Sequence, residues 1–165
     1  MGRILAIDPG DKQSGYVIVE HDGNEITCVI DKGKVTNEDM MAIMSSCGNY
    51  DFAIEMIQSY GMPVGASVFD TCVWIGRFIE HGLSGRLRPH RYIYRKEERL
   101  TICGSPKAKD ANIIRALIDR FAPNTGNKGK GTKAEPGFFY GFKGDIWQAM
   151  GVAVTYFDIY IKGHK

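Results

Sequence analysis

The sequence contains no apolar run of the length that crosses a lipid bilayer, which is about 20 residues. Its first residues enter a strand-like segment directly, without the pattern of a signal peptide. The four cysteines form no Cys-x-x-Cys pair, and no histidine stands at a spacing typical of zinc ligands. We therefore expect a cytoplasmic protein with no membrane contact, no zinc and reduced, mostly buried thiols.

A phosphate-binding loop is also missing. The segment 126–132, with the sequence GNKGKGT, is rich in glycine and lysine but lacks the GxxxxGK[ST] spacing. No predicted strand precedes it, so its backbone is not expected to hold a nucleotide phosphate at the start of a helix.

Positive and negative charges are distributed unevenly along the chain. Residues 1–85 contain 5 Lys or Arg against 12 Asp or Glu, whereas residues 86–165 contain 16 against 7. The acidic half could supply carboxylate chemistry and the basic half a surface that binds phosphates. The alternative is that charges of both signs mix over one folded surface.

Hydrophobic periodicity predicts a single mixed α/β domain over residues 1–165, with no linker and no internal repeat. Residues 122–143 have no periodicity, and their glycine and lysine content predicts a mobile loop. The predicted strands are 3–8, 14–20, 25–31, 51–57 and 87–94, and the predicted helices are 36–47, 65–82, 107–121 and 145–161.

Three acidic residues stand where predicted strands end or a predicted helix begins. Asp8 ends the first strand, Glu55 lies near the end of the fourth, and Asp145 opens the last helix. If these two strands are parallel neighbours, both of their acids emerge at one edge of the sheet. Acids gathered there repel one another unless a cation separates them, and Mg²⁺ prefers oxygen ligands. Two such ions about 4 Å apart can direct water against a phosphodiester.

Each of these acids could also have a purely structural role. Asp8 could cap the turn Asp-Pro-Gly, and Asp145 could stabilise the N-terminus of its helix. Glu55 lies between Ile54 and Met56, where an unpaired carboxylate is unfavourable. The predicted convergence of the three is stronger evidence than any one of them.

The motifs ILAIDPG…SGY, AIE and GDIWQAMGVAVTY occur in this order over nearly the whole chain. Together they resemble a RuvC-type Holliday junction resolvase, and most of all the phage and prophage branch. The resemblance implies a ribonuclease-H-like α/β fold, in which helices flank a mixed five-stranded sheet. It also implies a homodimer that uses Mg²⁺ or Mn²⁺ and makes paired nicks in four-way DNA junctions during recombination and repair. Asp8, Glu55 and Asp145 fall on the family's catalytic, metal-binding positions.

One position departs from the family pattern. A further acid is usual one helical turn after Asp145, where this chain has Gln148. Either three acids suffice or the activity is weak. Two alternatives to a junction resolvase therefore stay open: a broader nuclease for forks and flaps, and a junction-binding protein with marginal catalysis. An actin-like kinase, whose first strand also ends in an acid, needs two domains, and 165 residues are too few for them.

The basic half supplies candidate contacts to branched DNA. Lys107 and Lys109 stand where a helix is predicted to begin, and helix N-termini favour phosphate. In the family, an aromatic residue after the AIE motif wedges into the junction; Tyr60 is the nearest aromatic here, with Met62 as a rival. The alternative for the lysines is a solvated surface. Further lysines lie in or beside the glycine-rich loop and complete the candidate set: Lys128, Lys130, Lys133 and Lys143.

Overall fold

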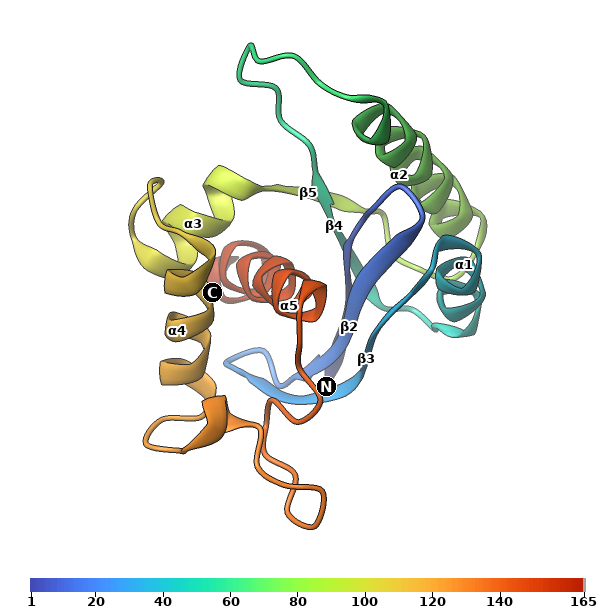
Figure 1. Cartoon of the computed structure of the whole chain (residues 1–165). Helices are drawn as coiled ribbons and strands as arrows, with labels where there is room; N and C mark the ends of the chain where they lie inside the picture. The colour runs from blue at the N-terminus through green and yellow to red at the C-terminus, as the bar shows by residue number, and fades with distance from the viewer. Residues whose placement is uncertain (165) are drawn as a thin grey trace.

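A mixed five-stranded sheet lies between two layers of helices in the computed structural model, which describes residues 1–164 (Figure 1). The strands are β1 (Gly2–Asp8), β2 (Gln13–His21), β3 (Ile26–Thr36), β4 (Asp51–Met56) and β5 (Arg91–Tyr94). The α-helices are α1 (Asn37–Ser46), α2 (Ala66–Ser84), α3 (Arg95–Cys103), α4 (Asp110–Phe121) and α5 (Asp145–Tyr156). Within residues 1–164, no helix is both long enough and apolar enough to cross a membrane.

The order of the strands in the sheet is β3-β2-β1-β4-β5. β1, β2 and β3 pair antiparallel, whereas β1 pairs parallel with β4 and β4 pairs parallel with β5. The carboxyl ends of β1, β4 and β5 therefore lie at the same edge. The five-stranded mixed sheet predicted from the sequence is confirmed.

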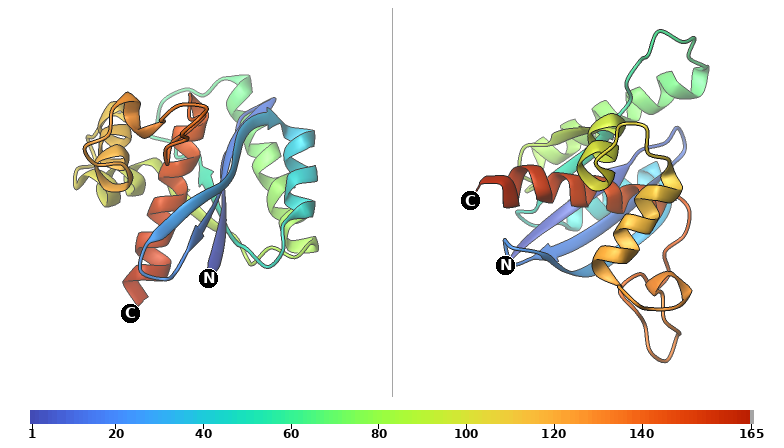
Figure 2. Two further views of the ribbon diagram at one scale, coloured as in Figure 1. Left: turned by 90° about the horizontal axis from the view of Figure 1, so that it is seen from below. Right: turned by 90° about the vertical axis from the view of Figure 1, so that its left-hand side faces the viewer.

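Alternate residues of the strands face two separate apolar cores. Ile4 and Ala6 of β1 face α5, which is covered in turn by α4 (Figure 2). Leu5 and Ile7 face the opposite way, towards α1 and α2. This two-sided burial explains why β1 is a continuous apolar run in the sequence.

Helix α5 is the most deeply buried helix of the fold, because all but two of its residues are buried. Small residues allow neighbouring elements to approach it closely. A Cβ atom added at Gly151 would lie 2.9 Å from Cδ of Glu98, a fully buried side chain of α3. Gly151 is therefore required by packing and not by a turn.

The sequence did not predict α3. The segment Arg95–Cys103 is strongly charged and buries Glu98 in place of an apolar residue, so its hydrophobic pattern is weak. The backbone N–H of Tyr94 donates to Glu97 Oε2 at 3.3 Å, and Gly104 ends the helix with a φ of 70°. β5 is correspondingly shorter than the predicted strand 87–94.

The glycine-rich loop 122–143 is anchored to the core, so the predicted mobile loop is wrong. Phe139 and Phe142 are buried and pack against Trp147 of α5 with ring centroids 4.8 and 5.0 Å away. The backbone N–H of Phe139 also donates to the carbonyl of Gly129 at 3.0 Å. Aromatic residues spaced irregularly in a loop leave no periodic signal, which is why the prediction missed this contact.

The cysteine prediction holds only in part. All four thiols are free, and Cys47 is buried, but Cys28 on β3 is exposed. Cys72 and Cys103 are half-buried, so the expectation of mostly buried thiols is wrong, and it holds only for Cys47.

The surroundings of Gly151 on α5 and Gly76 on α2 predict opposite effects of alanine substitution on stability. Gly151→Ala should lower the free energy of unfolding by about 1–3 kcal/mol, because its methyl group overpacks against Glu98. Gly76→Ala, at an exposed position of α2 with nothing within 4 Å, should raise it by up to about 1 kcal/mol. Urea denaturation of both variants measures the difference. Equal stability of Gly151→Ala and the wild type would contradict the close contact.

Candidate active site

Asp8 and Glu55 lie side by side at the carboxyl edge of the sheet. Asp8 is the last residue of β1, and the parallel register of Ile7 with Ile54 brings it beside Glu55 of β4. Both residues follow the alternation that faces α5, since Ala6 and Ala53 belong to the core on that side. The structure therefore brings together two of the three acids singled out in the sequence.

Burial disfavours ionisation of both carboxyl groups when no cation lies between them. Burial, and next the charge of Glu55, raise the pKa of Asp8 to about 9. Burial also raises the pKa of Glu55. One proton thus takes the place of a positive charge between the two carboxyl groups.

The third acid, Asp145, reaches the same edge as the first residue of α5. A Cβ atom added at Gly15 would lie 2.7 Å from the Asp145 carbonyl oxygen and 2.8 Å from its Cβ. Gly15 in turn pairs with Asp8 across β1 and β2. Asp145 is directed towards β3, where its Oδ2 is 2.6 Å from Nζ of Lys34. Lys34 was not among the predicted site residues.

The turn after Asp8 is fixed by a buried polar network. Ser14 Oγ donates to Asn37 Oδ1 at 2.6 Å, and Asn37 Nδ2 donates to the carbonyl of Gly10 at 2.9 Å. Both polar side chains are fully buried. The network attaches the turn to the first residue of α1, and so fixes where β1 ends.

Two arginines of α3 lie next to the acids and were missed because α3 was not predicted. Arg95 donates to Glu98 Oε2 at 2.7 Å and also pairs with Asp110 at the start of α4. The positive charges of Arg95 and Arg99 oppose the effect of burial on the pKa of Glu55. Among the described residues, Nε of Arg99 is buried without a hydrogen-bond partner.

The donor set fits a hard divalent cation, although the carboxylates are not arranged around one. Within residues 1–164, no three His, Cys, Asp or Glu side chains form a metal-binding cluster. Asp145 is paired with Lys34 instead of joining Asp8 and Glu55. The proton retained by Asp8 and the ammonium of Lys34 offset negative charge that a bound cation could offset instead. All three acids offer the oxygen ligands that Mg²⁺ prefers.

The candidate DNA-contacting residues are exposed, except for the half-buried Lys130, but they are spread widely. Lys107 and Lys109 lie immediately before α4, where Asn112 Oδ1 accepts a hydrogen bond from the Lys109 N–H. Tyr60 is 66% exposed, in the segment between β4 and α2. Figures 1 and 2 place this segment and the glycine-rich loop on opposite sides of the molecule. The loop carries Lys128, Lys130 and Lys133, while Lys143 lies two residues before Asp145.

Several arginines of the basic half are engaged within the fold. Arg120 donates to Glu25 at 2.6 Å and to Asp158 at 2.7 Å, and Arg88 pairs with Asp51 at 3.1 Å. The charge asymmetry of the sequence is therefore partly neutralised by pairs between the two halves of the chain.

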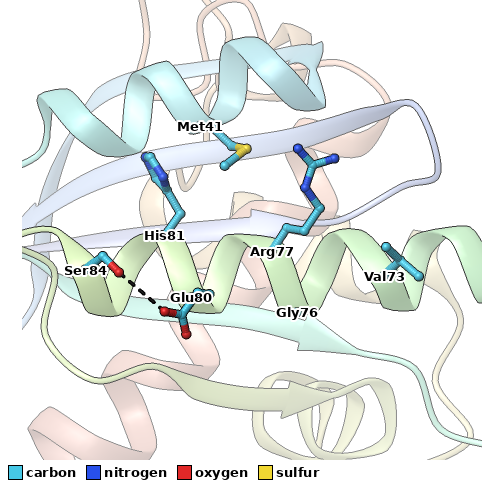
Figure 3. Close-up of a pocket in the computed structure, with 7 residues that line it drawn as sticks. All are labelled: Met41, Val73, Gly76, Arg77, Glu80, His81 and Ser84. Carbon is cyan, nitrogen blue, oxygen red and sulfur yellow. Dashed lines mark hydrogen bonds between the residues drawn. The ribbon is translucent and has the colours of Figure 1, made fainter.

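A cavity of about 500 Å³ lies away from the acids, between α1 and α2 (Figure 3). Met41, Val73, Arg77 and His81 are among the residues that line it. His81 Nε2 is 2.7 Å from Ser45 Oγ, so this histidine already has a protein partner. The cavity is on the opposite face of the sheet from α5 and shares no residue with the acidic edge.

The raised pKa of Asp8 predicts how stability depends on pH in EDTA. The folded protein retains a proton that the unfolded chain releases above the ordinary value of 3.8. This contribution is complete below about pH 4 and is lost as the pH rises towards 9. Asp8→Asn should therefore raise the melting temperature at pH 8 by at least about 3 °C.

Melting curves of both proteins from pH 5 to about 9 test this prediction. Asp39→Asn, an exposed acid of α1, is the matched control and should follow the wild type. Glu98, whose pKa burial raises to about 7, is present in all three proteins and does not affect the comparison. Parallel curves for the wild type and Asp8→Asn would contradict the shared proton.

Comparison with solved structures identifies RuvC of Thermus thermophilus as a structural neighbour. One structure aligns with a TM-score of 0.70 and 12% identity, over 96% of this chain and 97% of that one. T. thermophilus RuvC in complex with a Holliday junction substrate aligns with a TM-score of 0.64 and 12% identity, over 99% of this chain and 97% of that one. No family model and no curated protein matches the sequence. The chain therefore has the ribonuclease-H-like fold of RuvC.

Proposed function

We propose that this protein is a metal-dependent, structure-selective DNA endonuclease that resolves four-way junctions by paired nicks. The observation that carries the proposal is the placement of Asp8 and Glu55 side by side, next to Asp145, at the carboxyl edge of the sheet. The fold of a protein that has been solved with a Holliday junction substrate supports the choice of DNA.

Asp8, Glu55 and Asp145 would hold Mg²⁺ or Mn²⁺, in a site for two ions. Bound there, the ions would supply activation of water and stabilisation of the leaving oxygen of the phosphodiester. The residues contribute the geometry. The register of β1 with β4 places Asp8 beside Glu55, the end of β1 is fixed by the Asn37 network, and α5 presents Asp145 over Gly15. Water is the nucleophile, and no covalent intermediate with the protein forms.

The DNA backbone would be bound by lysines around this edge. Lys107 and Lys109 lie before α4 and Lys143 lies before α5, so these three are on the segments that lead into helices near the acids. Lys128, Lys130 and Lys133 would contact an arm of the junction further away. The exposed Tyr60 is proposed to insert at the centre of the junction.

Paired nicks need two sites, which a homodimer would supply. Exposed apolar side chains on α2 support this assembly, because Phe69 and Val73 are each 62% exposed and Leu83 is 53% exposed. Apolar side chains left exposed on one helix are suited to packing against an identical copy.

Conservative replacement of any of the three acids should abolish nicking without loss of junction binding. The variants are Asp8→Asn, Glu55→Gln and Asp145→Asn, and Asp39→Asn serves as the control. DNA affinity should persist because it depends mainly on lysine and arginine contacts to phosphate. Nicking of a labelled four-way junction in Mg²⁺, with gel-shift binding in Ca²⁺, measures both properties.

Near-wild-type cleavage by one variant would remove that residue from the site. Binding by the wild type without nicking in either Mg²⁺ or Mn²⁺ would instead indicate a junction-binding protein. Equal cleavage of four-way junctions, forks and flaps would indicate the broader debranching nuclease.

Removal of the two lysines before α4 should weaken DNA binding and reduce its dependence on salt. For Lys107→Ala with Lys109→Ala we expect the slope of log affinity against log salt to fall by about two, or about one per phosphate contact. Lys162→Ala, which lies beyond the opposite end of α5 from Asp145, is the control and should leave the slope unchanged. Filter binding between about 50 and 200 mM salt measures the slopes. An unchanged slope in the double variant would show that both lysines are only solvated.

A further inference from the structure

One row of residues crosses the sheet at the level of the acids. Lys34 of β3 pairs with Gly15 of β2, and Gly15 pairs with Asp8 of β1. Glu55 of β4 continues the row, one step beyond the pair of Ile7 with Ile54. Directly opposite residues present their side chains on the same face, so Lys34 shares the face of Asp8 and Glu55.

Asp145 lies over the gap in this row. Gly15 has no side chain, and the close approach of the Asp145 carbonyl and Cβ to it places the start of α5 between Lys34 and Asp8. From there the carboxylate reaches Lys34 Nζ at 2.6 Å. The negative charge of Asp145 also contributes to the raised pKa of Asp8. The Asp145 carboxylate thus lies between Lys34 and Asp8, and its ion pair with Lys34 holds it on the lysine side.

The pair of Lys34 and Asp145 is exchangeable. The two side chains are 46% and 40% exposed, and exposed ion pairs stabilise proteins only slightly. A divalent cation at Asp8 and Glu55 carries twice the charge of the ammonium and lies on the other side of Asp145. The two cations therefore compete for one carboxylate.

We propose that Lys34 is a positioning residue of this site, which holds the Asp145 carboxylate away from Asp8 and Glu55 and must release it when a divalent cation binds. This inference rests on the proposed metal site. Lys34 then sets the divalent-cation concentration at which the three carboxylates come together. It also explains why the three acids do not form a metal-binding cluster within the described residues.

The test is binding of Mn²⁺ to the full chain without DNA, measured by isothermal titration calorimetry. Lys34→Met should lower the dissociation constant about fivefold, because it removes the competing charge beside the cation. Lys34→Arg keeps the charge and should behave as the wild type. Lys32→Met makes the same charge change two residues along β3 and should alter the constant less than about twofold.

Melting curves in EDTA and in Mg²⁺ provide a second readout. Lys34→Met should have a lower melting temperature than the wild type in EDTA, because Asp145 loses the ammonium that pairs with it. Its melting temperature should rise more on addition of Mg²⁺, because the acids bind the metal more tightly. An equal or weaker Mn²⁺ affinity in Lys34→Met would overturn the competition, as would an equal gain in Lys32→Met. Absence of Mn²⁺ binding to the wild type would overturn the proposed metal site and this inference with it.

Discussion

The contact of α5 with the sheet determines both the core and the acidic edge. The helix is buried along nearly its whole length, so its position is set by side chains on every side. It approaches β2 closely only because residue 15 is glycine, and α3 closely only because residue 151 is glycine. These two contacts fix the helix near its start and near its middle. Asp145 is consequently held in register with the end of β1 by backbone packing, independently of its own charge.

Negative charge is concentrated where the packing is tight, and positive groups from two separate elements offset it. Lys34 reaches the site from β3, and Arg95 and Arg99 reach it from α3. Arg95 also compensates the fully buried Glu98. A cluster of acids whose negative charge is only partly offset in the metal-free protein retains its affinity for a further cation.

The resemblance to RuvC-type resolvases supplied the mixed five-stranded sheet. The alternating and continuous apolar patterns sufficed to predict its strands, four of the helices and the strand-end positions of Asp8 and Glu55. They could not predict α3, because its buried residue is the charged Glu98 and burial of an ion pair leaves no hydrophobic period. Lys34 was missed for a related reason: its position beside the acids depends on the register of β3 with β2, which no local pattern encodes. The anchoring of loop 122–143 by Phe139 likewise depends on a distant partner, Trp147.

The separation of Asp8 and Asp145 along the chain has a consequence during synthesis. The proposed catalytic set is incomplete until α5 has left the ribosome, so a nascent chain that already carries Asp8 and Glu55 cannot yet cut the nucleic acid around it. The same unfinished chain leaves Ile4, Ala6 and their neighbours without the helix that covers them. Translation that stops before residue 145 would thus yield an inactive product with an exposed apolar face, a ready substrate for chaperones and proteases.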